Sequence, residues 1–220
     1  MATVDIITSG RVDLTEYAAK KGYLRGARLD KADRYANHGV AVDFLDMDWN
    51  DPDPDKLIRA AKDHRPKYVV AGDYLRDEDN TQRVNDRARQ LRDLAENVIV
   101  VPKSPGDFQH IPEWCVVGYS VPTEYGGTDI PLREYASLPN QIHVLGGTPH
   151  RQFDVVSQLW LENVCSIDGN SIHKAATIGA KSWHPAVPHW RKVEADDAVE
   201  RAYRDSVDNL HAAHKARGYV

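Results

Sequence analysis

The stretch IHVLGGTPHRQFDVVSQLWLENVCSIDGN, residues 142–170, contains two short apolar runs separated by a segment of helical periodicity. The runs Ile142–Leu145 and Val164–Ile167 are continuous and rich in β-branched residues, which is typical of strands buried on both faces. Thr148 and Pro149 favour a helix start between them. A strand, a helix and a second strand in this order predict a parallel βαβ unit.

The same alternation extends over the rest of the chain. Further strands are expected at 4–7, 40–45, 68–71, 98–101 and 115–117, and helices at 54–64, 77–96, 148–162, 170–181 and, at the C-terminus, 194–217. About seven strands predict a single α/β domain over residues 1–220. Two architectures fit: a TIM-barrel-like parallel barrel, complete or reduced, and an open doubly wound sheet. We favour the barrel.

Composition limits the class of protein. The 220 residues carry a formal net charge of −5, which argues against a strongly basic nucleic-acid binder but leaves room for a local basic face. Cys115 and Cys165 lie in apolar runs and are expected to be core residues of a reducing compartment. Without a signal peptide or a long apolar run, we expect a cytoplasmic protein, in the host cytoplasm if viral, with no membrane partner.

Small and acidic residues follow the expected strands. Because the carboxyl ends of parallel strands meet on one rim, these residues are candidates for a common site. The residues at the strand ends are Ser9, Gly10, Asp46, Asp48, Asp73, Gly118, Ser120, Gly146, Gly147, Asp168 and Asn170. The structural alternative is that Asp46, Asp73 and Asp168 only cap the next helix or turn.

Two other features have both a functional and a structural interpretation. Gly146 and Gly147, between a strand and a helix, could leave backbone amides free to cradle a phosphate or a flat ring, or could simply permit a tight turn. The basic and aromatic stretch Trp183–Trp190 suits a nucleic-acid strand, or a surface loop anchored by its tryptophans. His143, within a strand, is expected to be a core or rim histidine with a satisfied partner.

The block from Gly146 to Asp168 resembles the tRNA-guanine transglycosylase superfamily, and in particular the short phage- and virus-type members that insert 7-deazaguanine bases into DNA. Its Gly-Gly-Thr-Pro segment, helix and strand are similar to the family segment that ends in the nucleophilic aspartate, which places that role on Asp168. Residues 117–122 look like the strand whose backbone faces the base. Residues 68–73 are similar to the strand that ends in the base-recognising aspartate, here Asp73.

The resemblance implies a base exchange in which Asp168 attacks C1′, guanine leaves and a 7-deazaguanine base replaces it, without a metal or other cofactor. A target in duplex DNA would be flipped out of the helix. The implied catalytic residues are Asp168, Asp73 and Asp46. The implied substrate-binding residues are Ser9, Gly10, Gly118, Tyr119, Ser120, Gly146, Gly147, Asn170 and Lys174.

The sequence departs from the family at two points. The family's second catalytic aspartate is replaced by Thr8, so that Asp43, Asp46 or Asp48 takes its role or the role is missing. The Cys/His zinc site and the tRNA-docking extension are also absent, which favours DNA or a free nucleotide over full-length tRNA as the acceptor. The oligomeric state, monomer or homodimer, is left open.

Three alternatives remain at this point. The first is a nucleoside or nucleotide glycosyl hydrolase, in which water replaces the incoming base. The second is a non-catalytic barrel that binds nucleic acid or protein through residues 183–190. The third is metal-assisted hydrolysis that uses Asp46, Asp48 and Asp73.

Overall fold

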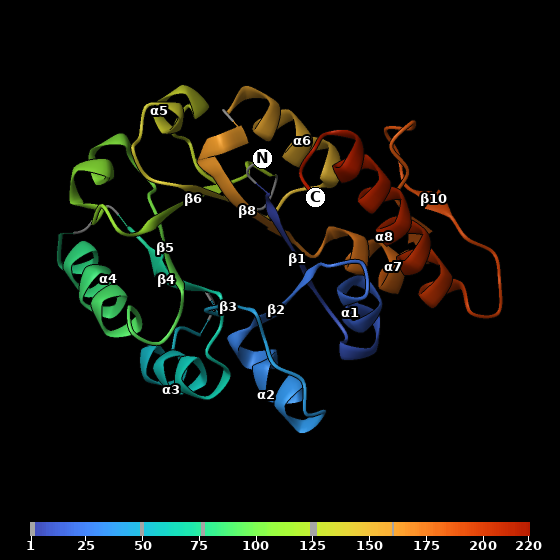
Figure 1. Ribbon diagram of the computed structural model, residues 1–220, viewed down its shortest axis with the longest axis horizontal. Coiled ribbons are helices and arrows are strands. Elements are labelled where there is room, and N and C mark those ends of the chain that lie inside the picture. Colours follow the sequence, from blue (N-terminus) through green and yellow to red (C-terminus); the bar gives the residue numbers. More distant parts are fainter. Residues whose placement is uncertain (1–2, 49–50, 76–77, 124–126, 160) are drawn as a thin grey trace.

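The computed structural model describes residues 3–48, 51–75, 78–123, 127–159 and 161–220, and these form an α/β barrel with its helices on the outside (Figure 1). The strands are β1 (Asp5–Ser9), β2 (Leu24–Arg28), β3 (Phe44–Asp46), β4 (Tyr68–Asp73), β5 (Asn97–Val101), β6 (Val116–Ser120), β7 (Ile142–Leu145), β8 (Val164–Gly169), β9 (Lys181–Ser182) and β10 (Arg191–Lys192). The helices are α1 (Val12–Ala19), α2 (Leu29–Asn37), α3 (Pro54–His64), α4 (Glu78–Leu91), α5 (Leu132–Ala136), α6 (Pro149–Gln158), α7 (Ser171–Gly179) and α8 (Ala198–Ala216).

Strands β1 to β8 close into a parallel barrel in chain order. Strand β1 completes the ring, because Ile7 pairs with Leu24 of β2 on one side and with Asp168 of β8 on the other. The barrel expectation is therefore confirmed, and the barrel is complete. The alternative of an open doubly wound sheet is wrong, and the count of about seven strands was low because it lacked β2.

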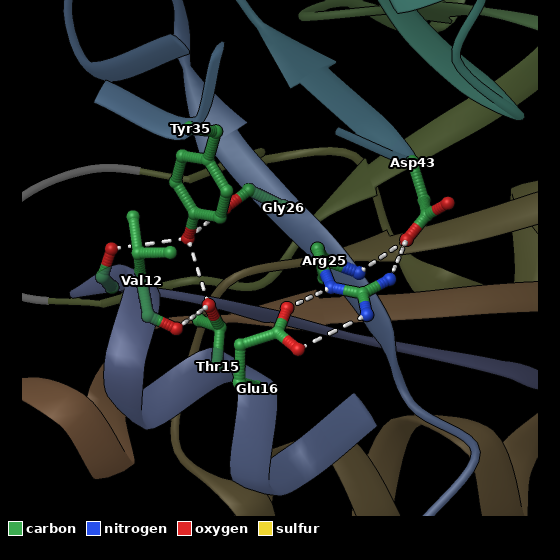
Figure 2. Close-up of polar contacts among 8 residues, drawn as sticks. Val12, Thr15, Glu16, Arg25, Gly26, Tyr35 and Asp43 are labelled. Carbon is green, nitrogen blue, oxygen red and sulfur yellow. Dashed lines mark hydrogen bonds and ion pairs between the residues drawn. The ribbon is translucent and has the colours of Figure 1, made fainter. Parts of the chain in front are cut away.

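Strand β2 was missed because its sequence, LRGAR, is polar instead of apolar. Its polar groups are satisfied by neighbouring elements. The Arg25 guanidinium pairs with Glu16 of α1 at 2.5 Å, and the Arg25 backbone N–H donates to the Asp43 carboxylate at 2.8 Å (Figure 2). An ion-paired arginine can thus occupy a barrel strand that hydropathy alone does not reveal.

Helix α2, which the sequence also did not predict, is fixed over the barrel by Tyr35. The fully buried Tyr35 hydroxyl lies 3.1 Å from the carbonyl oxygen of Gly10, 3.3 Å from that of Gly26 and 3.2 Å from the Thr15 hydroxyl (Figure 2). These contacts tie α2 to the loop after β1. They therefore set the position of that loop at the mouth of the barrel.

The expected helices are present, with small differences at their ends. Helix α3 matches the expected bounds and is capped by Asp53, whose carboxylate accepts from the Lys56 N–H at 2.8 Å. Helix α4 begins at Glu78, and the expected start at residue 77 lies outside the described residues. Helices α6, α7 and α8 are each shorter than expected by a few residues. No helix in the described part of the chain combines the length and apolarity that a membrane crossing requires.

Side chains alternate between the barrel interior and the helix layer, as the two-residue period of a strand requires. The interior holds a compact apolar cluster of Ile7, Phe44, Tyr68, Val70, Ile99, Val101 and Val116. The outward residues pack under the helices in two larger clusters. Buried Cys115 belongs to the outer core, as expected, whereas half-buried Cys165 contacts the interior cluster.

The structure distinguishes the two interpretations of the basic and aromatic stretch after α7 at Trp183. Strands β9 and β10 pair at its two ends. Trp183 is only 3% exposed and packs beside Phe153, at 5.9 Å between ring centroids, and beside His150, at 5.2 Å. A tryptophan that belongs to the core cannot stack on a base, so docking through Trp183 is wrong. The alternative of a surface segment anchored by tryptophan describes this residue correctly.

Interior packing leads to a stability prediction at Gly118. A Cβ atom at this position would lie 2.5 Å from Leu145 Cδ1 and 2.8 Å from Val101 Cγ2. We expect Gly118→Ala to lower the free energy of unfolding by about 1–3 kcal/mol, measured by chemical denaturation. Gly106→Ala is the matched control, since nothing lies within 4 Å of a Cβ there. An equal effect of both changes would contradict the packing described here.

Candidate functional site

The carboxyl ends of β1, β3 and β8 open into a cavity of about 1000 Å³. Asp168, Asp46 and Ser9 project into it from these strands, and Gly10, Asn170 and Lys174 line it from the adjoining loops and α7. Parallel strands place their carboxyl ends on one rim, which is why residues far apart in the sequence meet here. The structure thus brings together six of the residues proposed from the sequence.

Asp168 is held through one carboxylate oxygen. The Gly146 N–H donates to Oδ1 at 3.1 Å, and His143 Nε2 lies 3.3 Å from the same atom. The side chain is 16% exposed, and no hydrogen bond to Oδ2 is found among the described residues. One oxygen is therefore held by the Gly146 N–H, with His143 close by, while the other can meet a ligand in the cavity.

His143 lies inside the barrel beneath Asp168. It has no exposed surface, its Nδ1 is 2.7 Å from the Ser166 hydroxyl, and its ring stacks on Phe44 at 5.3 Å. When Ser166 donates to Nδ1, the ring proton is on Nε2 and faces Asp168. The expectation of a histidine with a satisfied partner therefore describes Nδ1 only, because Nε2 has no aligned hydrogen bond.

Gln152 of α6 supports Asp168 from behind, and sequence reasoning missed it. Its amide donates to the carbonyl oxygens of Gly146 at 2.8 Å and of Asp168 at 2.7 Å. Gly169 leaves room for this amide, since a Cβ there would lie 2.9 Å from Gln152 Nε2. The sequence did offer a signal for this role, because Gln152 is a polar residue on the apolar face of the expected helix, beside Phe153.

The glycine pair after β7 has a structural role. Both residues have positive φ, +69° at Gly146 and +80° at Gly147, which favours glycine. The Gly146 amide is used by Asp168, so the expectation of unobstructed amides is wrong at this residue. A Cβ at Gly147 would lie 2.8 Å from Val121 Cγ1. Gly146 orients the Asp168 carboxylate through its N–H, and neither glycine is among the residues that line the cavity.

Asp46 has the most perturbed carboxyl group of the cavity. Burial raises its pKa to about 8, and the negative charges of Asp168 and Asp73 act in the same direction. The charge of Arg28 opposes the rise only weakly. The Arg28 guanidinium is already engaged by Asp30 at 2.7 Å and by Asp48 at 3.5 Å. Asp46 therefore carries a proton at neutral pH.

The structure also shows which aspartate could replace the family's second catalytic aspartate. Thr8 is buried and neighbours Tyr203 in the helix layer, so its position does not face the cavity. Asp43 binds Arg25, and Asp48 pairs with Arg28. Of the three aspartates considered, Asp46 is the one that lines the cavity.

Asp73 does not line the cavity with Asp46 and Asp168. It pairs with Lys103 at 2.9 Å and is absent from the cavity lining, although its charge reaches Asp46. Among the described residues, no group of three or more His, Cys, Asp or Glu side chains is placed to hold a metal ion, so the grouping of Asp46, Asp48 and Asp73 expected for metal-assisted hydrolysis is not found.

Strand β6 contributes less to the cavity than the resemblance implied. Gly118 faces the packed interior, and Tyr119 points outward, with its ring edge-on to Tyr135 at 4.9 Å. Neither these residues nor Ser120 are among those that line the cavity. The Tyr119 side chain belongs to the outer core, and binding through the backbone of this strand, which the resemblance implies, stays a prediction.

The chain belongs to a protein family described as a family of unknown function (DUF6610), whose model matches residues 18–215. No curated protein matches the sequence. Among solved structures, the chain is similar to the YdjI aldolase from Escherichia coli K12, with a TM-score of 0.62 and 10% identity over 99% of this chain and 92% of that one.

Two further structures share the fold. A phosphoribosyl anthranilate isomerase, in complex with reduced 1-(o-carboxyphenylamino)-1-deoxyribulose 5-phosphate, has a TM-score of 0.52 and 11% identity over 96% of this chain and 100% of that one. D-Psicose 3-epimerase from Clostridium cellulolyticum H10, with D-tagatose, has a TM-score of 0.51 and 10% identity over 95% and 99%. At these identities the similarity shows a TIM barrel and no particular reaction.

The raised pKa of Asp46 predicts a pH-dependent cost to stability. Between its ordinary value of 3.8 and about 8, the folded protein holds a proton that the unfolded chain releases, so stability falls as pH rises through this range. Asp46→Asn does not ionise. We expect its advantage in free energy of unfolding over the unaltered protein to grow by roughly 3–4 kcal/mol from pH 5 to pH 8.

Urea denaturation at both pH values measures this difference. Asp63→Asn, which alters an exposed carboxylate on α3, is the control and should show no comparable change. A constant difference between Asp46→Asn and the unaltered protein would show that Asp46 is ionised throughout.

Proposed function

We propose that this protein is a glycosyltransferase that replaces guanine in DNA with a 7-deazaguanine base through a covalent bond between Asp168 and C1′ of the sugar. One observation carries the proposal: two carboxyl groups with different surroundings line the same cavity. Asp168 is held by the Gly146 amide and faces His143, whereas burial and neighbouring charges keep Asp46 protonated. Such pairs supply a nucleophile and an acid in glycosyl transfer.

In the first step an oxygen of Asp168 attacks C1′ while the bond from C1′ to N9 of guanine breaks. The electron pair of that bond leaves with guanine, and the proton of Asp46 passes to the departing base. The sugar is then esterified to Asp168, guanine is neutral and Asp46 is a carboxylate. The Gly146 N–H on Oδ1 keeps Asp168 oriented, which leaves Oδ2 for the attack.

The second step reverses these roles. N9 of the incoming 7-deazaguanine attacks C1′, the ester bond breaks with its electrons on Asp168, and the N9 proton passes to Asp46. Both carboxyl groups return to their starting states, and two inversions at C1′ give net retention. In the resembling family a second catalytic aspartate occupies the position that is Thr8 here. The proposal therefore assigns the role of that aspartate to Asp46.

The size of the cavity supports a bound nucleotide. Its volume of about 1000 Å³ lies at the upper end of ordinary ligand sites. Asp73 retains the role of base recognition in the proposal, because carboxylates accept well from the amino and imino hydrogens of guanine. That role requires Asp73 to exchange its contact with Lys103 for one with the base.

Incorporation of labelled base tests the reaction. We expect the protein, incubated with guanine-containing DNA and a radiolabelled 7-deazaguanine, to transfer label to the DNA and to form a covalent protein–DNA adduct. Asp168→Asn should abolish both, because the amide is not nucleophilic, while Asp63→Asn should retain both. Release of guanine without incorporation would instead identify a glycosyl hydrolase. Adduct formation by Asp168→Asn would disprove the assignment of the nucleophile.

The acid role of Asp46 predicts the alkaline limb of the pH profile. Ionisation of Asp46 removes the proton that the leaving base needs, so the rate of base release should fall above about pH 8. Asp46→Asn should lower this rate by roughly 10²-fold or more and should lose the alkaline limb. A single-turnover measurement of guanine release between pH 6 and 10 tests this expectation. If Asp46→Asn keeps the same alkaline limb, the limb belongs to the ionisation of another group.

A further inference from the structure

One face of helix α2 carries a basic stripe toward the cavity. Arg28, Lys31, Arg34 and His38 follow one another at spacings of three or four residues, and all four line the cavity. This spacing places them on the same side of the helix. In a chain of net charge −5, such a local concentration of basic groups at the mouth of this cavity marks a surface for an anionic ligand.

The basic groups differ in how far acidic neighbours neutralise them. Arg28 and Lys31 share Asp30, at 2.7 Å and 2.6 Å. Neither Arg34 nor Lys174 of α7 has an ion-pair partner among the described residues, and both are exposed. These two cations can therefore bind a ligand without first giving up a protein partner.

The arrangement separates two kinds of charge. Asp46 and Asp168 lie at the strand ends, half-buried, whereas Arg34 and Lys174 stand on the exposed helices α2 and α7, with α1 between these helices (Figure 1). A nucleoside at the carboxyl groups would have its sugar–phosphate linkages at the mouth. Phosphates on either side of that nucleoside would then meet a cation on each helix.

We infer that Arg34 and Lys174 bind the phosphates that flank the reacting nucleotide, so that the acceptor is a nucleic-acid strand. The identity of the reacting base rests on the proposed function, but strand binding is measurable without turnover. A free nucleotide offers the same phosphate chemistry, with one attachment point in place of two. The experiment must therefore compare a strand with a mononucleotide.

The test uses the full chain and a fluorescein-labelled 12-nucleotide single-stranded DNA with one central guanine. Fluorescence anisotropy gives Kd between 50 and 200 mM salt. The double variant Arg34→Gln/Lys174→Gln should bind roughly tenfold more weakly at 50 mM salt, and its log–log salt slope should be smaller by about 1.4, since each single-strand phosphate contact contributes about 0.7.

The matched control is Arg59→Gln/Lys62→Gln on α3, which removes the same charge from exposed positions outside the cavity. It should leave Kd and slope unchanged. Equal weakening by both double variants, or no salt-dependent binding by the unaltered protein, would overturn the inference. Binding of GMP as tight as that of the strand would also overturn it and identify a nucleotide ligand.

The two proposals fail separately. Strand binding that depends on Arg34 and Lys174, without any incorporation of labelled base, would leave this binding surface standing and disprove the exchange reaction. Incorporation of labelled base at the same rate in the double variant and in the unaltered protein would support the exchange reaction and disprove the binding surface.

Discussion

Closure of the barrel between its first and last strands is the constraint on which the site depends. Pairing of β1 with β8 sets Ile7 beside Asp168, so that Ser9 and Gly10 reach the same cavity as Asn170 and Lys174. The same closure seals the interior in which His143 and Ser166 form their hydrogen bond. An open sheet would leave these two ends of the chain at opposite edges, and the cavity would not exist.

The closed barrel also creates an electrostatic conflict at its mouth. Asp46, Asp73 and Asp168 come close enough for the last two to raise the pKa of the first, and the nearby Arg28 is engaged with other aspartates. A carboxyl group placed as Asp46 is lowers stability, because burial disfavours its charged form. A fold retains such a cost where the perturbed group is useful, which is why the pair of Asp46 and Asp168 supports a catalytic proposal.

The structure holds Asp168 largely through buried side chains. Gln152 joins the carbonyl groups of Gly146 and Asp168, and His143 lies below the carboxylate with its other nitrogen bonded to Ser166. Buried polar groups restrict side-chain orientation when their partners are satisfied. The orientation of the Asp168 carboxylate is therefore set by the barrel interior and by α6. The exposed helices α2 and α7 provide positive charge at the mouth of the cavity.

The sequence by itself determined the alternation of buried strands and helices and the strand-end position of Asp168, and it favoured a parallel barrel, whose closure only the pairing of β1 with β8 decided. Apolar runs and helical periodicity are local patterns, and a parallel sheet brings its strand ends together whatever the details. The sequence did not reveal β2, because Arg25 is neutralised by residues of other elements. Only the tertiary structure decided that Asp46, and not Asp43 or Asp48, lines the cavity, that Trp183 is buried and that Tyr119 points outward. Burial and charge pairing depend on neighbours that are distant in the chain.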